Sequence, residues 1–221
     1  NITSSYIDVQ ARLSALEAQR ERLNALAEGW MRTRQAHLER ERGSVYFHGQ
    51  RVAKGVLELR RRVTEDASHD EILRAAAIFH DIGKGIEPHA QSGAALVCGL
   101  LREEIAPQAL AEIARLIAAH CDRRPREDAH DVWARLLQDA DLLDHFGSYG
   151  IWMLSMNAAN LSHGSIEALN EFYQNQYDEY IRKNRALLNF AQSLAVFDEK
   201  DAFVRKFASR LRVESAGGYC I

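Results

Sequence analysis

Histidine and aspartate residues interrupt positions that otherwise belong to the buried faces of helices. His80 ends a row of apolar residues at the i, i+3, i+4, i+7 spacing of a helix face, and Asp81 follows it directly. His48 lies among valines at a similar spacing, and Asp141 borders another apolar face. Imidazole and carboxylate groups are common protein ligands of divalent metal ions. The pattern therefore predicts that these side chains share a metal ion.

The cost of burying such groups supports the same prediction. An unpaired buried polar group costs about 1–3 kcal/mol. Four of them would cost about 4–12 kcal/mol, against a typical domain stability of about 5–15 kcal/mol. The groups must therefore have partners, and one ion can serve His48, His80, Asp81 and Asp141 together. A mixed imidazole and carboxylate set suits Mn²⁺, Fe²⁺, Co²⁺ or Zn²⁺ better than Ca²⁺.

The elements that must position these residues are expected to be helices. The chain has 221 residues, of which 47% are hydrophobic, and it has only three prolines. Residues that favour helices dominate, and no segment shows the alternation typical of a strand. We predict an all-α single domain over residues 1–221. Its expected parts are an N-terminal helical extension (1–43), a metal-binding core (44–160), C-terminal helices (161–213) and a flexible tail (214–221).

Composition and charge narrow the class of protein. The formal net charge of −3 does not favour a protein whose main partner is a nucleic acid. No apolar run is long enough to span a bilayer, and no signal peptide is recognisable. The three cysteines, Cys98, Cys121 and Cys220, do not suggest a disulfide framework. These features favour a protein of the reducing cytoplasm.

The N-terminal part predicts one long helix, from Ser5 to about Glu41. An apolar stripe runs along it from Val9 to Trp30, interrupted by Arg20. This stripe can pack across the domain, or it can join two copies of the chain in a homodimer.

The string from Phe79 to Lys84 (Phe-His-Asp-Ile-Gly-Lys), with His48 before it and Asp141 after it, resembles the HD-domain superfamily of metal-dependent phosphohydrolases. The resemblance covers about His48–Gly150. It is nearest to a bacterial subgroup of HD-type nucleoside triphosphate pyrophosphohydrolases, although Leu142 stands where that subgroup commonly has an arginine. It implies an all-helical HD fold with additional N-terminal and C-terminal helices. It also implies that His48, His80, Asp81 and Asp141 are the metal ligands.

The expected activity is divalent-metal-dependent phosphohydrolysis of a small phosphorylated substrate, with a nucleotide favoured by the resemblance. Asp81 and Lys84 are the candidate catalytic residues, because Lys84 follows the ligands and can neutralise phosphate charge. Arg123 and Arg124, in a polar segment after His120, carry guanidinium groups that suit phosphate oxygens. Such a segment can also be an ordinary solvated loop.

Other hypotheses remain open from the sequence alone. His89 and His120 are candidates for a second metal ion or for substrate contact, and Asp144 for orienting a ligand. A second ion would indicate a dinuclear enzyme, such as a phosphodiesterase or a di-iron oxygenase. A different class is a regulatory module that binds a nucleotide without turning it over. The base, the sugar, the number of phosphates removed and the physiological metal cannot be read from the sequence.

Overall fold

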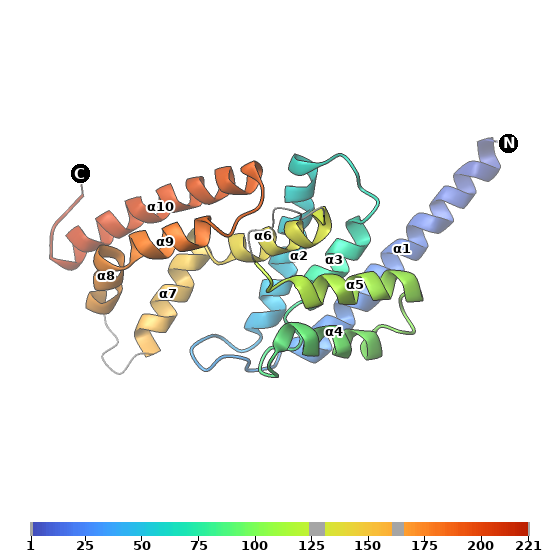
Figure 1. Cartoon of the computed structure of the whole chain (residues 1–221), viewed down its shortest axis with the longest axis horizontal. Helices are drawn as coiled ribbons and strands as arrows, with labels where there is room; N and C mark the ends of the chain where they lie inside the picture. The colour runs from blue at the N-terminus through green and yellow to red at the C-terminus, as the bar shows by residue number, and fades with distance from the viewer. Residues whose placement is uncertain (1, 124–130, 161–165, 221) are drawn as a thin grey trace.

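The computed structural model describes residues 2–123, 131–160 and 166–220, and the prediction of an all-α fold is confirmed for them. Figure 1 shows their arrangement. The helices are α1 (Ile2–Met31), α2 (Ser44–Val63), α3 (Asp70–Phe79), α4 (His89–Leu100), α5 (Pro107–Ala119), α6 (Val132–Asp144), α7 (Ser148–Asn160), α8 (Ile166–Asn175), α9 (Tyr177–Arg185) and α10 (Ala191–Ser215).

The core lies among α2, α3, α5 and α6. Helix α2 packs against both α3 and α6, and α3 also packs against α5. The apolar faces predicted from the sequence are the faces that meet, because Leu73, Leu116 and Leu137 are each fully buried. At the start of α6, the Asp131 side chain accepts a hydrogen bond of 3.1 Å from the backbone N–H of Ala134. The core thus fixes the three helices that lead to the predicted ligands, together with α5, which leads to His120.

Helix α1 has two different halves. Its second half packs on the core, where Leu23 and Ala27 are buried. Its first half projects beyond the rest of the molecule (Figure 1), and Val9 and Leu13 are about half exposed (51% and 49%). The stripe therefore packs across the domain only in part.

The expectation that the first helix reaches Glu41 is wrong, because α1 ends at Met31. Residues 32–43 form turns, and the backbone N–H of Gly43 donates to the Arg34 carbonyl at 2.9 Å. Gly43 itself has a φ of 79°, a value that favours glycine. Leaving the helix allows Arg34 to reach the loop that carries Lys84, as described below.

The C-terminal helices attach to the end of α6. The Phe146 and Phe197 rings pack with centroids 4.6 Å apart, and Lys200 donates to the carbonyls of Leu143 and Phe146 at 3.0 and 3.2 Å. The last helix, α10, ends at Ser215, just inside the predicted tail. None of the described helices combines the length and the apolar character needed to cross a membrane.

Candidate metal centre

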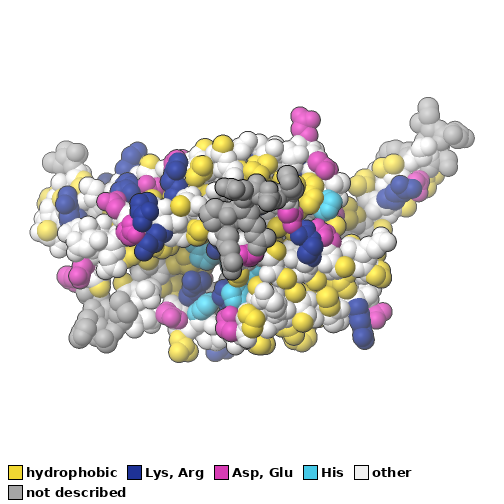
Figure 2. Space-filling view, viewed as in Figure 1, with side chains coloured by type: hydrophobic (Ala, Val, Ile, Leu, Met, Phe, Trp, Pro, Cys, Tyr) yellow, Lys and Arg dark blue, Asp and Glu magenta, His cyan; other side chains and the backbone are white. Residues whose placement is uncertain are grey.

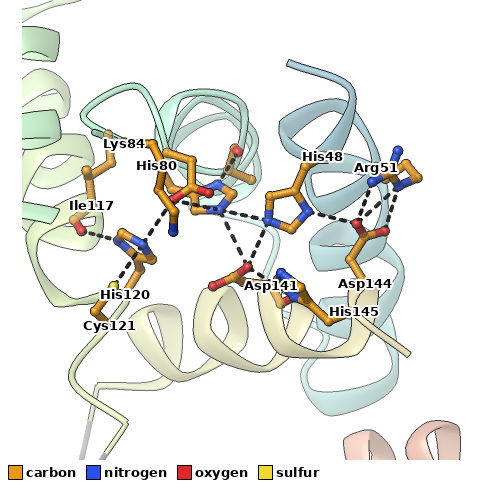
Figure 3. Close-up of polar contacts among 12 residues, drawn as sticks. His48, Arg51, His80, Lys84, Ile117, His120, Cys121, Asp141, Asp144 and His145 are labelled. Carbon is orange, nitrogen blue, oxygen red and sulfur yellow. Dashed lines mark hydrogen bonds and ion pairs between the residues drawn. The ribbon is translucent and has the colours of Figure 1, made fainter. Parts of the chain in front are cut away.

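Three helices bring the predicted ligands together (Figure 3). His48 lies on α2, His80 caps the C-terminus of α3 with Asp81 beside it, and Asp141 lies on α6; all four are buried. Close approach of α2 to α3 makes this possible. A Cβ atom on Gly49 would lie 2.5 Å from the Ile78 carbonyl oxygen, so a larger residue there would push the helices apart. The residue after His48 thus sets the spacing of the centre.

The nitrogen and oxygen atoms of this group converge on one point. His48 Nε2 lies 3.2 Å from His80 Nε2 and 2.9 Å from Asp141 Oδ1. The Nε2 atom of His80 also lies 3.5 Å from Asp141 Oδ1 and 3.9 Å from Asp81 Oδ1. Three groups that include these residues have ligand atoms that all lie within 4.8 Å of one another: His48 with His80 and Asp81, His80 with Asp141 and His120, and His48 with Asp141 and His145. A metal ion at the centre can be reached by these atoms after small adjustments.

Hydrogen bonds on the far side of each ring fix which nitrogen faces the centre. His80 Nδ1 donates to the Ala77 carbonyl at 2.8 Å, so its Nε2 carries a lone pair toward the ion site. His48 Nδ1 lies 2.7 Å from Asp144 Oδ2, which likewise leaves Nε2 for the centre. Two lone pairs 3.2 Å apart need a proton or a cation between them. The donor set therefore fits a divalent metal ion.

The charges of the centre follow from the same contacts. Burial alone would lower the pKa of His48, but hydrogen bonds to Asp141 and Asp144 outweigh it and raise that pKa to about 9. Burial alone would raise the pKa of Asp81 and Asp141, but attraction to the His80 ring and hydrogen bonds from neighbouring imidazoles hold both pKa values well below the usual range. Without a metal, the site holds two carboxylates with a proton on His48.

Asp144 supports the centre from outside. It accepts from His48 and from Arg51, whose Nε lies 2.9 Å from Oδ1 and whose Nη2 lies 2.9 Å from Oδ2. The Arg51 guanidinium stacks on the Tyr149 ring, 3.7 Å from its centroid. Burial would raise the pKa of Asp144, but the bonds from His48 and Arg51 lower it to about 2. Asp144 thus holds the His48 ring in place, and its role in orienting a metal ligand stays a prediction beside that of holding a helix junction.

The second group of candidates surrounds Asp81 on its other side. His89 Nε2 and His120 Nε2 each lie 3.6 Å from Asp81 Oδ1. His120 Nδ1 donates to the Ile117 carbonyl at 2.6 Å, so its Nε2 lone pair also points inward. The Sγ atom of Cys121 lies 3.1 Å from His120 Nε2 and 3.2 Å from His89 Nε2. These three residues form a further group that could hold a metal ion, and it shares His120 with the group of His80 and Asp141.

Two of the three predicted phosphate-binding residues lie at the site. Lys84 Nζ lies 3.3 Å from both Asp81 Oδ1 and His89 Nε2, so it belongs to the site. Arg123 is brought to the site as well, because its Nη2 pairs with Asp141 Oδ2. Arg124 lies outside the described residues. In Figure 2, histidine, lysine and arginine side chains gather around a hollow near the middle of the molecule.

Three residues of the site were missed from the sequence. His145 donates from Nδ1 to the Asp141 carbonyl at 2.9 Å, and burial lowers its pKa to about 4, so it is neutral. Arg34 donates to the carbonyls of Ile82 and Lys84 at 2.6 and 2.8 Å and so holds the loop that carries Lys84. Cys121 directly follows His120 in the sequence, and this position could have marked it as a candidate ligand. Arg34 and His145 had no comparable signal.

Comparison with known proteins finds a family match over the segment that contains this centre. Residues 45–145 match the HD domain, and this range includes all the predicted ligands. A comparison with curated proteins finds no match.

Three solved structures share the fold over most of the chain. YpgQ of Bacillus subtilis aligns with a TM-score of 0.63 at 18% identity, over 90% of this chain and 95% of its own. A Lactobacillus plantarum protein aligns with a TM-score of 0.59 at 19% identity, over 91% and 98%. A protein of an uncultured Thermotogales bacterium, described as a predicted HD superfamily hydrolase, gives 0.58 at 20% identity, over 88% and 91%. At these identities, the likeness concerns the fold.

Proposed function

We propose that this protein is a divalent-metal-dependent phosphohydrolase that acts on a small phosphorylated molecule, with a nucleotide as the preferred substrate class. One observation carries the proposal. The Oδ1 atom of Asp81 lies 3.9 Å from Nε2 of His80 and 3.3 Å from Nζ of Lys84. A metal ligand with a cation next to it is what a phosphate group requires. The HD domain and the Thermotogales hydrolase support the same activity.

The ligand set assigns the roles. His48, His80, Asp81 and Asp141 would hold the ion, which would be Mn²⁺, Fe²⁺, Co²⁺ or Zn²⁺. When bound, such an ion polarises a phosphoryl oxygen and lowers the pKa of a bound water. Lys84 offsets the negative charge of the phosphate beside Asp81. Arg123, now paired with Asp141, offers a forked guanidinium group to the phosphate oxygens.

The Asp144 pair and the Arg34 bonds serve these groups indirectly. Asp144 keeps the His48 ring in the tautomer whose Nε2 faces the ion. Arg34 fixes the carbonyls of Ile82 and Lys84 and so limits where the Lys84 side chain can reach. Neither group needs to touch a substrate.

The test is a panel of nucleoside mono-, di- and triphosphates with added Mn²⁺, with separate detection of phosphate and pyrophosphate. We expect release of one of these products by the wild-type chain. The variant Asp81→Ala should lose turnover while keeping its helicity by circular dichroism. Turnover at the wild-type rate in Asp81→Ala, or none with any phosphate compound in the wild type, would contradict the proposal.

The dinuclear alternative has one specific observation in its favour. His89, His120 and Cys121 converge as a second group, and Asp81 Oδ1 lies 3.6 Å from both imidazoles. Bridging carboxylates are typical of two-metal sites. The number of ions bound per chain separates the alternatives, because a single ion excludes dinuclear chemistry.

A further inference from the structure

A cavity of about 270 Å³ lies next to the metal centre. Its walls come from residues 32–43, the C-terminal end of α6, α7 and α9. The residues that concern us are His37, Arg40, His145, Leu154, Asn157 and Tyr180. The cavity and the centre share one wall, because the His145 ring packs against the ring of His48 with centroids 4.9 Å apart.

His145 gives this wall a defined chemistry. Its Nδ1 donates to the Asp141 carbonyl, so its Nε2 is unprotonated and can accept a hydrogen bond. His145 also forms a group with His48 and Asp141 whose ligand atoms all lie within 4.8 Å of one another, so its ring lies between the centre and the cavity. An acceptor on the wall of a cavity suits a hydroxyl or amino group of a ligand.

The remaining lining combines a rigid aromatic face with polar edges. Tyr180 is held by the rings of Phe146 and Phe172, at centroid distances of 5.5 and 5.7 Å. Leu154 adds an apolar surface, and Arg40 and Asn157 add donors, with an acceptor on the amide. A flat, heteroatom-rich ring needs both kinds of surface.

The segment that carries Arg40 is tied down. Gln35 Nε2 donates to the Arg40 carbonyl at 2.7 Å, and Asn160 Nδ2 of α7 donates to the Glu39 carbonyl at 3.4 Å. Arg40 lines the cavity together with His145 and Tyr180. Its side chain therefore reaches the cavity from a fixed backbone.

The cavity is also oriented toward the phosphate end of the site. The segment that supplies His37 and Arg40 to the cavity also holds the Lys84 loop, because Arg34 donates to the carbonyls of Ile82 and Lys84 at 2.6 and 2.8 Å. One short segment therefore joins the cavity to the loop that carries Lys84. A molecule with phosphates beside Lys84 can extend past His37 into the cavity.

We propose that this cavity binds the nucleoside part of the substrate, with the base against Tyr180 and its polar edge facing Arg40 and Asn157. The proposal rests on the proposed function for its substrate class. Stacking on one aromatic face is worth about 1–3 kcal/mol per base. The proposal assigns substrate specificity to residues 32–43, α7 and α9. These elements are separate from the helices α2, α3 and α6, which carry the metal ligands.

The experiment measures binding and turnover separately. Binding of AMP, GMP, CMP and UMP is measured by calorimetry for the wild type, Arg40→Ala and Asn157→Ala. The matched control is Arg61→Ala, an exposed arginine of α2 that pairs with Glu58. We expect binding of the best nucleotide to weaken about tenfold in Arg40→Ala, because one charge-assisted hydrogen bond is worth about that factor in affinity. Binding should stay unchanged in the control.

Turnover then compares the best nucleoside triphosphate with inorganic tripolyphosphate, which has no base. The ratio of kcat/KM for these two compounds should fall about tenfold in Arg40→Ala. An unchanged ratio, or nucleotide binding unaffected in both cavity variants, would overturn the cavity assignment and leave the hydrolase proposal standing. Weakened nucleotide binding in a chain that hydrolyses neither compound would support the cavity and contradict the hydrolase.

Discussion

Two buried aspartates on α6 have opposite surroundings. Asp139 accepts from the backbone N–H groups of Asn189 and Phe190, at 3.0 and 3.2 Å, and from the Asn189 amide at 2.6 Å. Burial outweighs these bonds and raises the pKa of Asp139. Asp141 instead faces imidazole nitrogens and the Arg123 guanidinium, which hold its pKa well below the usual range against the effect of burial.

The difference separates a structural carboxylate from a ligand. Neutral N–H donors satisfy Asp139 within the protein, so it joins the α9–α10 junction to α6. Around Asp141, the inward-facing Nε2 lone pairs of His48 and His80 can be satisfied only by a proton or a cation. Burial alone does not mark a functional carboxylate; the type of its partners does.

The largest effect should come from Asp141→Asn. Loss of this ligand should reduce turnover by more than about 100-fold, because even partners outside the ligand set are worth 10–100-fold. The same change at the other carboxylate, Asp139→Asn, should leave turnover within a few-fold. Steady-state kinetics at saturating Mn²⁺ makes the comparison, and equal losses in the two variants would remove the distinction.

Lys84→Ala should lower kcat/KM by about 10–100-fold without releasing the metal. The lost interaction is a charge-assisted bond to phosphate, worth about 1.5–3 kcal/mol. Metal content and kinetics are measured on the same preparation. Lys84→Arg, which keeps the charge, should recover part of the rate. A variant that loses its metal in proportion to its rate would show that Lys84 acts on the ion site and not on the substrate.

Metal binding should release a proton at neutral pH. In the metal-free chain, His48 has a pKa of about 9, above its ordinary value of 6.5. This raised pKa stabilises the fold fully below about 6.5, and the stabilisation is lost as the pH rises through about 9. The ion competes with that proton, so metal affinity should increase with pH up to about 9. Calorimetry in buffers of different ionisation enthalpy measures the release; no dependence on the buffer would contradict it.

Asp139→Ala should act on stability alone. Removing its carboxylate leaves buried N–H donors of Asn189 and Phe190 unsatisfied, which should lower the free energy of unfolding by about 1–3 kcal/mol. Urea unfolding of the metal-free chain measures it, with Asp198→Ala, an exposed residue of α10, as the control. If Asp139→Ala lost its metal but kept its stability, Asp139 would act as a ligand, and the roles assigned to the two aspartates would be wrong.

The smallest effect should come from Cys121→Ser. A thiolate beside two imidazoles favours soft ions, so the serine variant should bind Zn²⁺ or Co²⁺ more weakly at the second group, with the first ion unchanged. A Co²⁺ titration should show thiolate-to-metal absorption only in the wild type. Its absence there would exclude Cys121 as a ligand.

The sequence predicted the part of the site that depends on helix periodicity. His80 and His120 were found because each ends an apolar row, and the row dictates which helix face is buried. The all-α class followed from the excess of residues that favour helices and the lack of alternating segments. The string after His80 was interpreted through its family resemblance and through the charge of Lys84. The structure shows that Gly83 has a packing role as well, because a Cβ atom there would meet the His89 carbonyl and the Gly93 backbone of α4.

What the sequence could not predict depends on contacts between distant segments. Arg34 looked like part of a continuous helix, yet it leaves α1 to bind carbonyls on the Lys84 loop. Asp139 and Asp141 belong to one short motif, and periodicity alone cannot say which neighbours each will meet. Arg40 and Tyr180 reach the cavity from turns and from α9, where no apolar pattern points to a shared site.

The most direct test of the metal centre is the metal content per chain of protein purified without a chelator and then titrated with Co²⁺. The wild type and Asp139→Asn should each bind at least one ion per chain, and Asp141→Asn should bind fewer. No ion in the wild type after titration, or equal binding by Asp141→Asn, would mean that the buried imidazoles and carboxylates satisfy one another and hold no metal.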